Sequence, residues 1–245
     1  MRNSMQIKVY EQGNCYCLYD ELAIAQFSPD MLKAQYWQNT NAVTGSAQGR
    51  GTTWFVQHNN HHWVLRHYYR GGLIGKLVKD SYLFTSLKNT RAAQEFALLA
   101  HMQTLSLPVP KPVAYRIVRR GFLYRADILS SRIENAQDLV AILSKQALTT
   151  DIWKKIGVTI KQFHDNNIYH HDLNAHNILI NEQQEVFLID FDRGELREAD
   201  SSGWQQSNIA RLLRSFTKEL NKLKNFNWSE ENWQMLLKGY KQVSS

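Results

Sequence analysis

Cysteine is scarce in this chain, with only Cys15 and Cys17 among its 245 residues. Two thiols one residue apart are too few for a disulfide framework, and such close neighbours rarely form a bridge. A structural zinc site would need four ligands. We therefore expect both thiols to be reduced, and a chain of this length can bury enough surface to fold without covalent staples.

Long apolar runs are also missing. Residues 96–100 form one of the longest, far short of the roughly 20 apolar residues that span a bilayer. The first ten residues are polar and lack the apolar core of a signal peptide. No repeat or low-complexity tract is present. We expect a protein that is soluble or that attaches to a surface.

Basic residues are concentrated in the first half of the chain. Residues 1–133 carry 16 Lys and Arg against 7 Asp and Glu, whereas residues 134–245 carry 13 against 15. This imbalance is typical of a basic half that meets an acidic partner: nucleic acid, anionic lipid or a phosphorylated substrate. An ordinary solvated basic face fits the same counts, so charge alone does not decide.

The first half of the sequence predicts an antiparallel sheet of five strands. Runs rich in β-branched and aromatic residues, separated by turn residues, place these strands at 42–44, 52–56, 62–68, 113–118 and 122–133. Ser28-Pro29-Asp30 predicts a helix start that leads into residues 31–37.

One longer helix is expected in the same half, starting from a cap at Asn89 or Thr90 and continuing to about Leu105. Its buried stripe would include Leu98, Met102 and Leu105. Glu95 falls on that stripe, where a carboxylate is costly unless a cation meets it.

Helical patterns dominate the second half, at residues 137–143, 151–166, 204–224 and 233–240. Two short apolar runs, 177–180 and 186–189, interrupt them as strands. The layout predicts a smaller α+β lobe over residues 1–133 and a mainly helical catalytic lobe over residues 134–245.

Three polar residues carry the most specific chemistry: Asp172, Asn177 five residues later, and Asp190 at the end of a short apolar run. Phosphoryl transfer needs a carboxylate that accepts the hydroxyl proton and oxygen ligands for Mg²⁺. We expect Asp172 to be the base and Asn177 and Asp190 to hold the metal. The flanking apolar runs should pair as a ribbon that brings Asn177 and Asp190 together.

These motifs resemble the protein-kinase-like fold. His170-His171-Asp172-Leu173 with Asn177 is similar to its catalytic loop, and Asp190-Phe191-Asp192 to its metal-binding triplet. The resemblance implies a two-lobed α+β fold with ATP in the cleft below a glycine-rich loop. The adenine would lie against backbone around Arg132–Glu134.

The full sequences of the two motifs, together with Trp63–Gly72 and with Trp204, Asn208 and Arg211–Arg214, match fewer families than the generic kinase pattern does. Over roughly residues 45–215 the chain resembles the Kdo kinases, where Kdo is 3-deoxy-D-manno-octulosonic acid. This resemblance implies phosphorylation of the 4-hydroxyl of Kdo on a Kdo–lipid A precursor in lipopolysaccharide biosynthesis, using ATP. It also implies a peripheral location on the cytoplasmic face of the bacterial inner membrane.

The nucleotide should be held by the bend that contains Gly45, Gly49 and Gly51, since glycines let backbone N–H groups approach phosphate oxygens. Protein kinases offer a Lys on the third strand, whereas this chain has Arg66. A guanidinium can bind phosphate bidentately and pair with Glu95, so we expect Arg66 to do both.

The acceptor is expected to be small, because only 55 residues follow Asp190 and none resembles a peptide-docking subdomain. Arg193 either receives the carboxylate of an acidic acceptor or forms a structural ion pair. Asp192 stands where protein kinases have Gly, and it either assists the metal or contacts Arg193.

Several alternatives compete with this interpretation. The His-His-Asp run with His176 would also fit a zinc hydrolase, although the downstream Asp190 fits phosphoryl transfer better. A heptose or aminoglycoside kinase shares the generic motif, and a non-catalytic lipid-binding pseudokinase would explain the basic half. No recognised nucleic-acid module is present, so we expect no nucleic-acid partner. We expect an anionic membrane surface instead.

Overall fold

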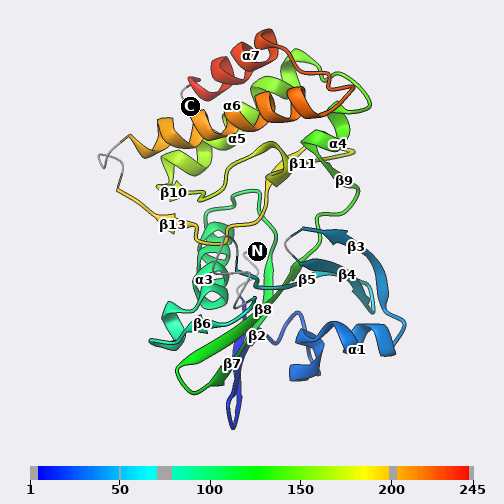
Figure 1. Ribbon diagram of the computed structural model, residues 1–245, viewed down its shortest axis with the longest axis vertical. Helices are drawn as coiled ribbons and strands as arrows, with labels where there is room; N and C mark the ends of the chain where they lie inside the picture. The colour runs from blue at the N-terminus through cyan, green and yellow to red at the C-terminus, as the bar shows by residue number, and fades with distance from the viewer. Residues whose placement is uncertain (1–4, 50, 71–78, 199–202, 243–245) are drawn as a thin grey trace. The chain divides into compact units, whose positions relative to one another are not determined.

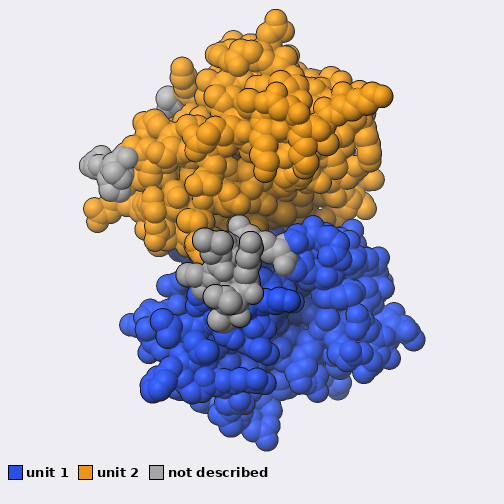
Figure 2. Space-filling model, viewed as in Figure 1, with its two compact units in different colours: residues 1–104, 110–132 blue, residues 105–109, 133–245 orange. Residues whose placement is uncertain are grey.

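The computed structural model describes residues 5–49, 51–70, 79–198 and 203–242. The chain divides into two compact units, coloured separately in Figure 2. Unit 1 comprises residues 1–104 and 110–132, and unit 2 comprises residues 105–109 and 133–245. The predicted split after residue 133 did not assign segment 105–109 to the second unit. That segment belongs there because the carbonyl of Pro108 accepts a 3.1 Å hydrogen bond from the backbone of Leu188.

Unit 1 is built on one antiparallel sheet that has eight strands within the described residues (Figure 1). Seven follow the order β1-β2-β7-β8-β5-β4-β3, and β6 pairs with β8. Their bounds are β1 Ile7–Gln12, β2 Cys15–Asp20, β3 Val43–Gln48, β4 Thr52–His58, β5 His61–His67, β6 Tyr82–Leu83, β7 Pro112–Arg120 and β8 Leu123–Ser131.

The prediction of five strands was wrong in number. The five expected strands correspond to β3, β4, β5, β7 and β8, which are neighbours in the sheet. Strand β1 was missed, and its pattern of Ile7, Lys8 and Val9 does not mark a buried face, because five of its six residues are exposed. Strand β6 is only two residues long and carries no periodicity at all.

The helices of unit 1 are η1 Pro29–Leu32, α1 Ala34–Asn39, η2 Leu87–Asn89 and α3 Arg91–Thr104. The predicted start at Ser28 is confirmed, since its hydroxyl accepts from the backbone of Asp30. Leu98 and Met102 are buried on α3 as expected, but Leu105 lies beyond the helix and is 37% exposed. The chain leaves the helix axis there, and Ser106 adopts a left-handed φ of 55°.

Unit 2 combines helices with short strands. Its elements are β9 Ala136–Asp138, α4 Leu139–Leu143, α5 Thr150–Asp165, β10 Ile168–Tyr169, η3 Ala175–Asn177, β11 Ile178–Asn181, β12 Val186–Leu188, β13 Glu195–Leu196, α6 Trp204–Lys222 and α7 Glu230–Tyr240. The helix expected at 137–143 starts two residues later, because residues 136–138 pair with β11 as a strand. The three longest helices gather at one side of this unit (Figure 1).

Helices α5 and α7 cross with their backbones in contact. A Cβ atom added to Gly157 would lie 2.0 Å from the carbonyl oxygen of Leu236, and one added to Gly239 would lie 2.0 Å from that of Lys154. Glycine at both positions is therefore a steric requirement of the crossing. This contact anchors α5, whose C-terminal end leads directly into the loop described below.

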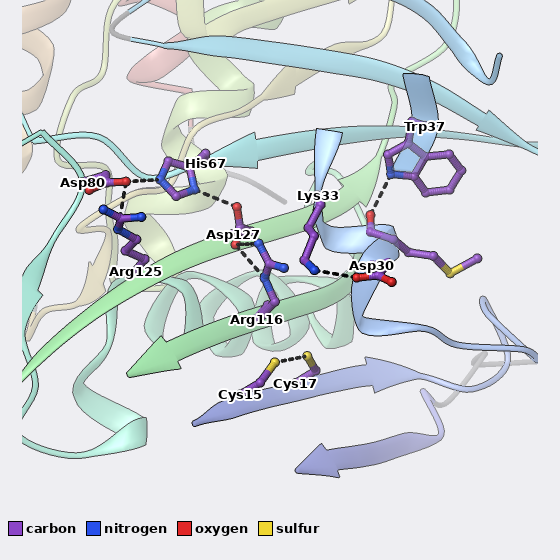
Figure 3. A network of polar contacts seen from close by, with 11 residues as sticks. Cys15, Cys17, Asp30, Lys33, Trp37, His67, Asp80, Arg116, Arg125 and Asp127 are labelled. Atoms are coloured by element: carbon purple, nitrogen blue, oxygen red, sulfur yellow. Dashed lines mark hydrogen bonds and ion pairs between the residues drawn. The ribbon is translucent and has the colours of Figure 1, made fainter. Parts of the chain in front are cut away.

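A network of charged side chains crosses three strands of unit 1 (Figure 3). His67 on β5 contacts Asp127 on β8 at 2.7 Å through Nδ1 and Asp80 at 3.3 Å through Nε2. Arg116 on β7 binds the other oxygen of Asp127 at 2.8 Å, and Arg125 pairs with Asp80 at 3.1 Å. Each carboxylate thus has two cationic partners when His67 is protonated.

This network makes the stability of unit 1 depend on pH through His67. Burial alone would lower the pKa of His67, but hydrogen bonds and attraction from Asp127 and Asp80 outweigh it and raise the pKa above 6.5. A raised folded-state pKa contributes stability that is full below about pH 6.5 and is lost as pH rises through the folded value. We expect His67→Gln to lower the melting temperature more at pH 6 than at pH 9.

The measurement is a series of thermal melts of both proteins between pH 6 and pH 9. His101→Gln is a matched control, because His101 is exposed on α3. A melting-temperature difference between wild type and His67→Gln that stays constant over this range would show that the pKa of His67 does not change on folding.

Candidate active site

Asp172 lies in a loop of unit 2 between β10 and η3, and a buried histidine holds its backbone. The ring of His170 binds the carbonyl oxygen of Ile189 through Nε2 at 2.9 Å, and its Nδ1 faces the backbone N–H of Asp172 at 3.1 Å. Since a carbonyl only accepts and an N–H only donates, the ring must be neutral with its proton on Nε2. Burial also lowers the pKa of His170, which favours this form. A neutral ring therefore ties the Asp172 loop to the residue before Asp190.

Asn177 is buried and closes the same loop. Its side-chain nitrogen donates to the carbonyl oxygen of Asp172 at 2.9 Å, and its own carbonyl accepts from the backbone of Ile189 at 3.0 Å. Strands β11 and β12 pair with Ile178 opposite Leu188, which confirms the predicted ribbon. The pairing brings Asn177 next to Ile189, the residue directly before Asp190.

Asp190 has a left-handed backbone with φ of 62°. Few side chains tolerate this region, and Asp is one of those enriched there. Phe191 fixes the turn, because its fully buried ring stacks on Phe163 and packs against His170. The buried ring of Phe191 thus fixes the backbone position from which the exposed side chain of Asp190 extends.

Helix α6 supports the loop from one face. The buried amide of Asn208 accepts from the backbone N–H of His170 at 3.3 Å and donates to its carbonyl at 3.0 Å. One and two turns further, Arg211 contacts Asp172 and the hydroxyl of Ser215 accepts from the backbone of Ala175 at 3.0 Å. Ser215 was missed from the sequence, although its spacing from Asn208 and Arg211 on one helical face is a readable signal.

Arg211 is the charged neighbour of the expected base. Its Nη1 lies 3.3 Å from Oδ1 of Asp172, with the Arg211 and Asp172 side chains 42% and 49% exposed. The contact is direct but open to solvent, so it contributes little to stability. Its effect is to place a positive charge beside Asp172.

The residues expected to hold magnesium offer suitable atoms. The nitrogen of the Asn177 amide is used by Asp172, so the amide oxygen is the atom that remains for a cation. Together with the Asp190 carboxylate it gives an all-oxygen donor set, which suits Mg²⁺.

His176, which belongs to the zinc alternative, and His164 both have other contacts. His164 bonds the Tyr240 hydroxyl at 2.7 Å, and burial lowers its pKa to about 4. His176 pairs with Asp138 at 3.3 Å, and this contact raises its pKa. Within the part of the chain that the structure describes, no group of three His, Cys, Asp or Glu side chains is placed to hold a metal ion.

In unit 1, Arg66 and Glu95 form the predicted pair. Nη2 of Arg66 lies 2.5 Å from both carboxylate oxygens of Glu95, and the Tyr68 hydroxyl donates to one of them at 2.6 Å. Glu95 is only 4% exposed. The buried carboxylate on the apolar stripe of α3 is therefore met by a cation, as its position required.

The glycine-rich bend is shorter than predicted. Gly45 lies inside β3, whose pairing continues to Gln48 opposite Thr52, so its placement in the bend was wrong. The remaining loop is closed by a 3.0 Å bond from the Gly49 N–H to the Gly51 carbonyl. A side chain at Gly51 would collide with the Tyr69 ring. Arg50, between these two glycines, lies outside the described residues.

The residues expected near the adenine fall at the end of one unit and the start of the other. The Arg132 N–H donates to the His62 carbonyl at 2.9 Å, and the guanidinium packs over the Phe55 ring. Glu134 lies in unit 2, before β9.

Beyond the metal site, Arg193 is exposed with φ of 60° in a turn that the Gly194 N–H closes onto Phe191 at 2.7 Å. Asp192 lies in the same turn and is partly exposed.

The loop carboxylate and the Asn–Asp oxygen pair of unit 2, and the buried Arg–Glu pair of unit 1, are the groups expected in a phosphotransferase of the kinase class. The family model that matches is described as the lipopolysaccharide kinase (Kdo/WaaP) family, over residues 34–240. The chain belongs to that family. It is therefore a sugar kinase that uses ATP.

Similar proteins carry a consistent name. A protein of Vibrio parahaemolyticus named 3-deoxy-D-manno-octulosonic acid kinase is 47% identical over 94% of this chain and 95% of its own length. Proteins of the same name from Mannheimia succiniciproducens and Haemophilus influenzae are 48% and 44% identical, covering 85% and 95% of this chain and 89% and 99% of their own lengths. Among the described residues, no helix is long and apolar enough to cross a membrane.

The Arg66–Glu95 contact predicts strong energetic coupling. A double-mutant cycle with Arg66→Gln and Glu95→Gln should show a coupling of about 0.5–3 kcal/mol in the free energy of unfolding, as contacting residues do. Chemical denaturation of the four proteins measures it. The matched control cycle combines Arg66→Gln with Gln94→Ala, because Gln94 is the residue before Glu95 on α3 and is exposed. Additive losses at Arg66 and Glu95 would show that the two side chains do not interact in solution.

Proposed function

We propose that this chain uses ATP and Mg²⁺ to phosphorylate the 4-hydroxyl of a Kdo residue on a Kdo–lipid A precursor in lipopolysaccharide biosynthesis. The observation that carries the proposal is the frame of His170, Asn177 and Asn208, which ties the Asp172 loop to the segment that starts at Asp190. The names of the relatives favour Kdo over a heptose or an aminoglycoside. The fold would be a protein-kinase-like one.

In this proposal Asp172 accepts the proton of the attacking hydroxyl, and its orientation comes from the hydrogen bonds of its own backbone to His170 and Asn177. Magnesium, when bound by Asn177 and Asp190, neutralises charge on the phosphate oxygens. The rate enhancement comes from positioning and charge neutralisation rather than from covalent chemistry.

In unit 1, the guanidinium of Arg66 binds nucleotide phosphate, and Glu95 with Tyr68 fixes its orientation. Gly51 supplies a backbone N–H group to the phosphates, and the bond from the Gly49 N–H to the Gly51 carbonyl holds the bend. The backbone around Arg132–Glu134 meets the adenine.

Arg211 supports an acidic acceptor. A guanidinium beside the base repels a cationic aminoglycoside, whereas it attracts the carboxylate of an acidic sugar. Arg211 stands on a long helix and already contacts Asp172, while Arg193 projects from a turn. We therefore assign acceptor carboxylate binding to Arg211 rather than Arg193.

A peripheral location on the cytoplasmic face of the inner membrane is part of the proposal. The excess of Lys and Arg in residues 1–133 supports it, because basic segments are attracted to anionic lipid.

Asp172→Asn is the direct test of the mechanism. We expect ATP binding to persist while turnover on a Kdo-lipid acceptor falls at least roughly a hundredfold, the usual scale for loss of a general base. Asp151→Asn is the control, since that side chain is 90% exposed on α5. Product masses identify the phosphorylated acceptor. Turnover of Asp172→Asn within a few-fold of wild type would remove Asp172 from the mechanism, and wild-type protein that binds ATP without turning over would be a pseudokinase.

The role of Arg211 is tested by changing the acceptor as well as the enzyme. With wild type, the methyl ester of the acceptor carboxylate should react roughly ten- to a hundredfold more slowly in kcat/KM than the acid, the scale of one charge-assisted contact. Arg211→Gln should erase most of this acid-to-ester ratio, and the ratio is the readout because Arg211 also orients Asp172.

Lys218→Gln is the matched control, being an exposed cation two turns further along α6. If Arg211→Gln keeps the wild-type preference for the acid over the ester, the carboxylate is recognised elsewhere.

A further inference from the structure

Four apolar residues with exposed or partly exposed side chains lie on the paired segments at one end of the unit 1 sheet. Phe122 is 87% exposed, Leu83 71% and Leu123 39%, and Phe84 beside them is partly buried. Single exposed apolar residues are common on soluble proteins, but a contiguous group marks an interaction site. We name this group, with Arg119 and Arg120, the hairpin tip.

The sheet itself holds the hairpin tip together. Strand β6 pairs with β8 so that Leu83 lies opposite Leu123, and the Phe84 N–H donates to the Phe122 carbonyl at 2.9 Å. Phe122 occupies the two-residue turn between β7 and β8, where Gly121 has φ of 59°. The tight turn projects Phe122 outward, so its exposure follows from the backbone and not from a loose loop.

Cations surround these apolar side chains. Segments 81–88 and 118–125 contain Lys88, Arg119 and Arg120 and not one Asp or Glu, whereas Arg125 in the second segment pairs with Asp80. Arg119 and Arg120 are exposed, and the guanidinium of Arg119 packs 4.1 Å from the centre of the Phe84 ring. An aromatic and aliphatic tip with a basic rim matches the interface of an anionic bilayer, which offers negative headgroups above an apolar layer.

The size of the surface also favours lipid. A stable protein interface buries about 800 Å² on each partner, around 20–30 residues, and four apolar side chains fall well short of that. A membrane needs no complementary surface, because buried apolar area and attraction to anionic headgroups act together even for small insertions.

We infer that the hairpin tip inserts into the headgroup region of an anionic bilayer and so docks this kinase on the membrane. The inference rests on the proposed function, since a lipid-linked acceptor requires the enzyme to work at that surface. Arg70, another cation of unit 1, is engaged within the protein, because its guanidinium bonds the Ser81 carbonyl at 2.6 Å and packs over Tyr82.

Co-sedimentation of the full chain with vesicles tests the inference. Wild type should bind phosphatidylglycerol-containing vesicles and not pure phosphatidylcholine, and salt should weaken the binding. Phe122→Ser should weaken it about tenfold or more, because an aromatic side chain no longer leaves water. Replacing Arg119 and Arg120 with Gln should weaken it by roughly fivefold per arginine and reduce the salt dependence.

Leu22→Ser is the matched apolar control, since Leu22 is 62% exposed elsewhere in unit 1, and Lys155→Gln with Lys218→Gln is the charge control. Circular dichroism and thermal melts check folding of each variant. Undiminished vesicle binding of a folded Phe122→Ser protein, or equal binding to neutral vesicles, would overturn the inference. So would a wild-type dimer that Phe122→Ser converts to monomer, because the tip would then be a self-association surface.

Kinase assays on a soluble, lipid-free acceptor separate this inference from the proposed function. Phe122→Ser should phosphorylate that acceptor at the wild-type rate while losing vesicle binding. A wild-type enzyme without activity on any Kdo acceptor would refute the proposed function, whatever the vesicles show.

Discussion

The neutral ring of His170 is the interaction on which the catalytic part of unit 2 depends. One ring nitrogen accepts from the backbone of Asp172 and the other donates to the carbonyl of Ile189. Both bonds require one tautomer, and burial lowers the pKa of His170 so that this neutral form persists. A protonated ring would face the Asp172 N–H with a second donor. The base and the metal-binding segment therefore share a single buried support that carries no charge.

Much of this site was predictable because its chemistry is local in sequence. Residues 168–180 and 186–192 contain the loop, the ribbon and the metal-binding triplet, and two short apolar runs determine the pairing of Ile178 with Leu188. The carboxylate on the buried stripe of α3 likewise predicted a cationic partner. What the sequence did not predict is non-local: Ser215 binds a loop 40 residues away, and only its spacing from Asn208 and Arg211 pointed to that role. The missed strands are a similar case, because β1 is ordered by pairing with β2 and not by its own pattern.

Glycine illustrates a second limit of sequence reasoning. A Gly-rich run predicts a bend, yet pairing of the strands extends through Gly45 and leaves only residues 49–51 outside the ladder. Gly157 and Gly239 have a different role, since both lie within helices and each permits the backbones of two helices to meet. A glycine in the sequence indicates either a close backbone contact or an unusual backbone conformation, and only the tertiary structure distinguishes the two.

Arg at position 66, where protein kinases have Lys, follows from how Glu95 is buried. The carboxylate on α3 is almost fully desolvated and needs several donors to compensate. Nη2 of the guanidinium reaches both of its oxygens, and the guanidinium carbon lies 5.0 Å from the centre of the Tyr68 ring, whose hydroxyl also donates to the carboxylate. An ammonium is a compact point charge that stacks less well on an aromatic face. Replacement of Arg66 by Lys would therefore keep the positive charge but weaken the contacts with Glu95 and the Tyr68 ring. These contacts favour Arg at position 66 as much as any phosphate that it binds.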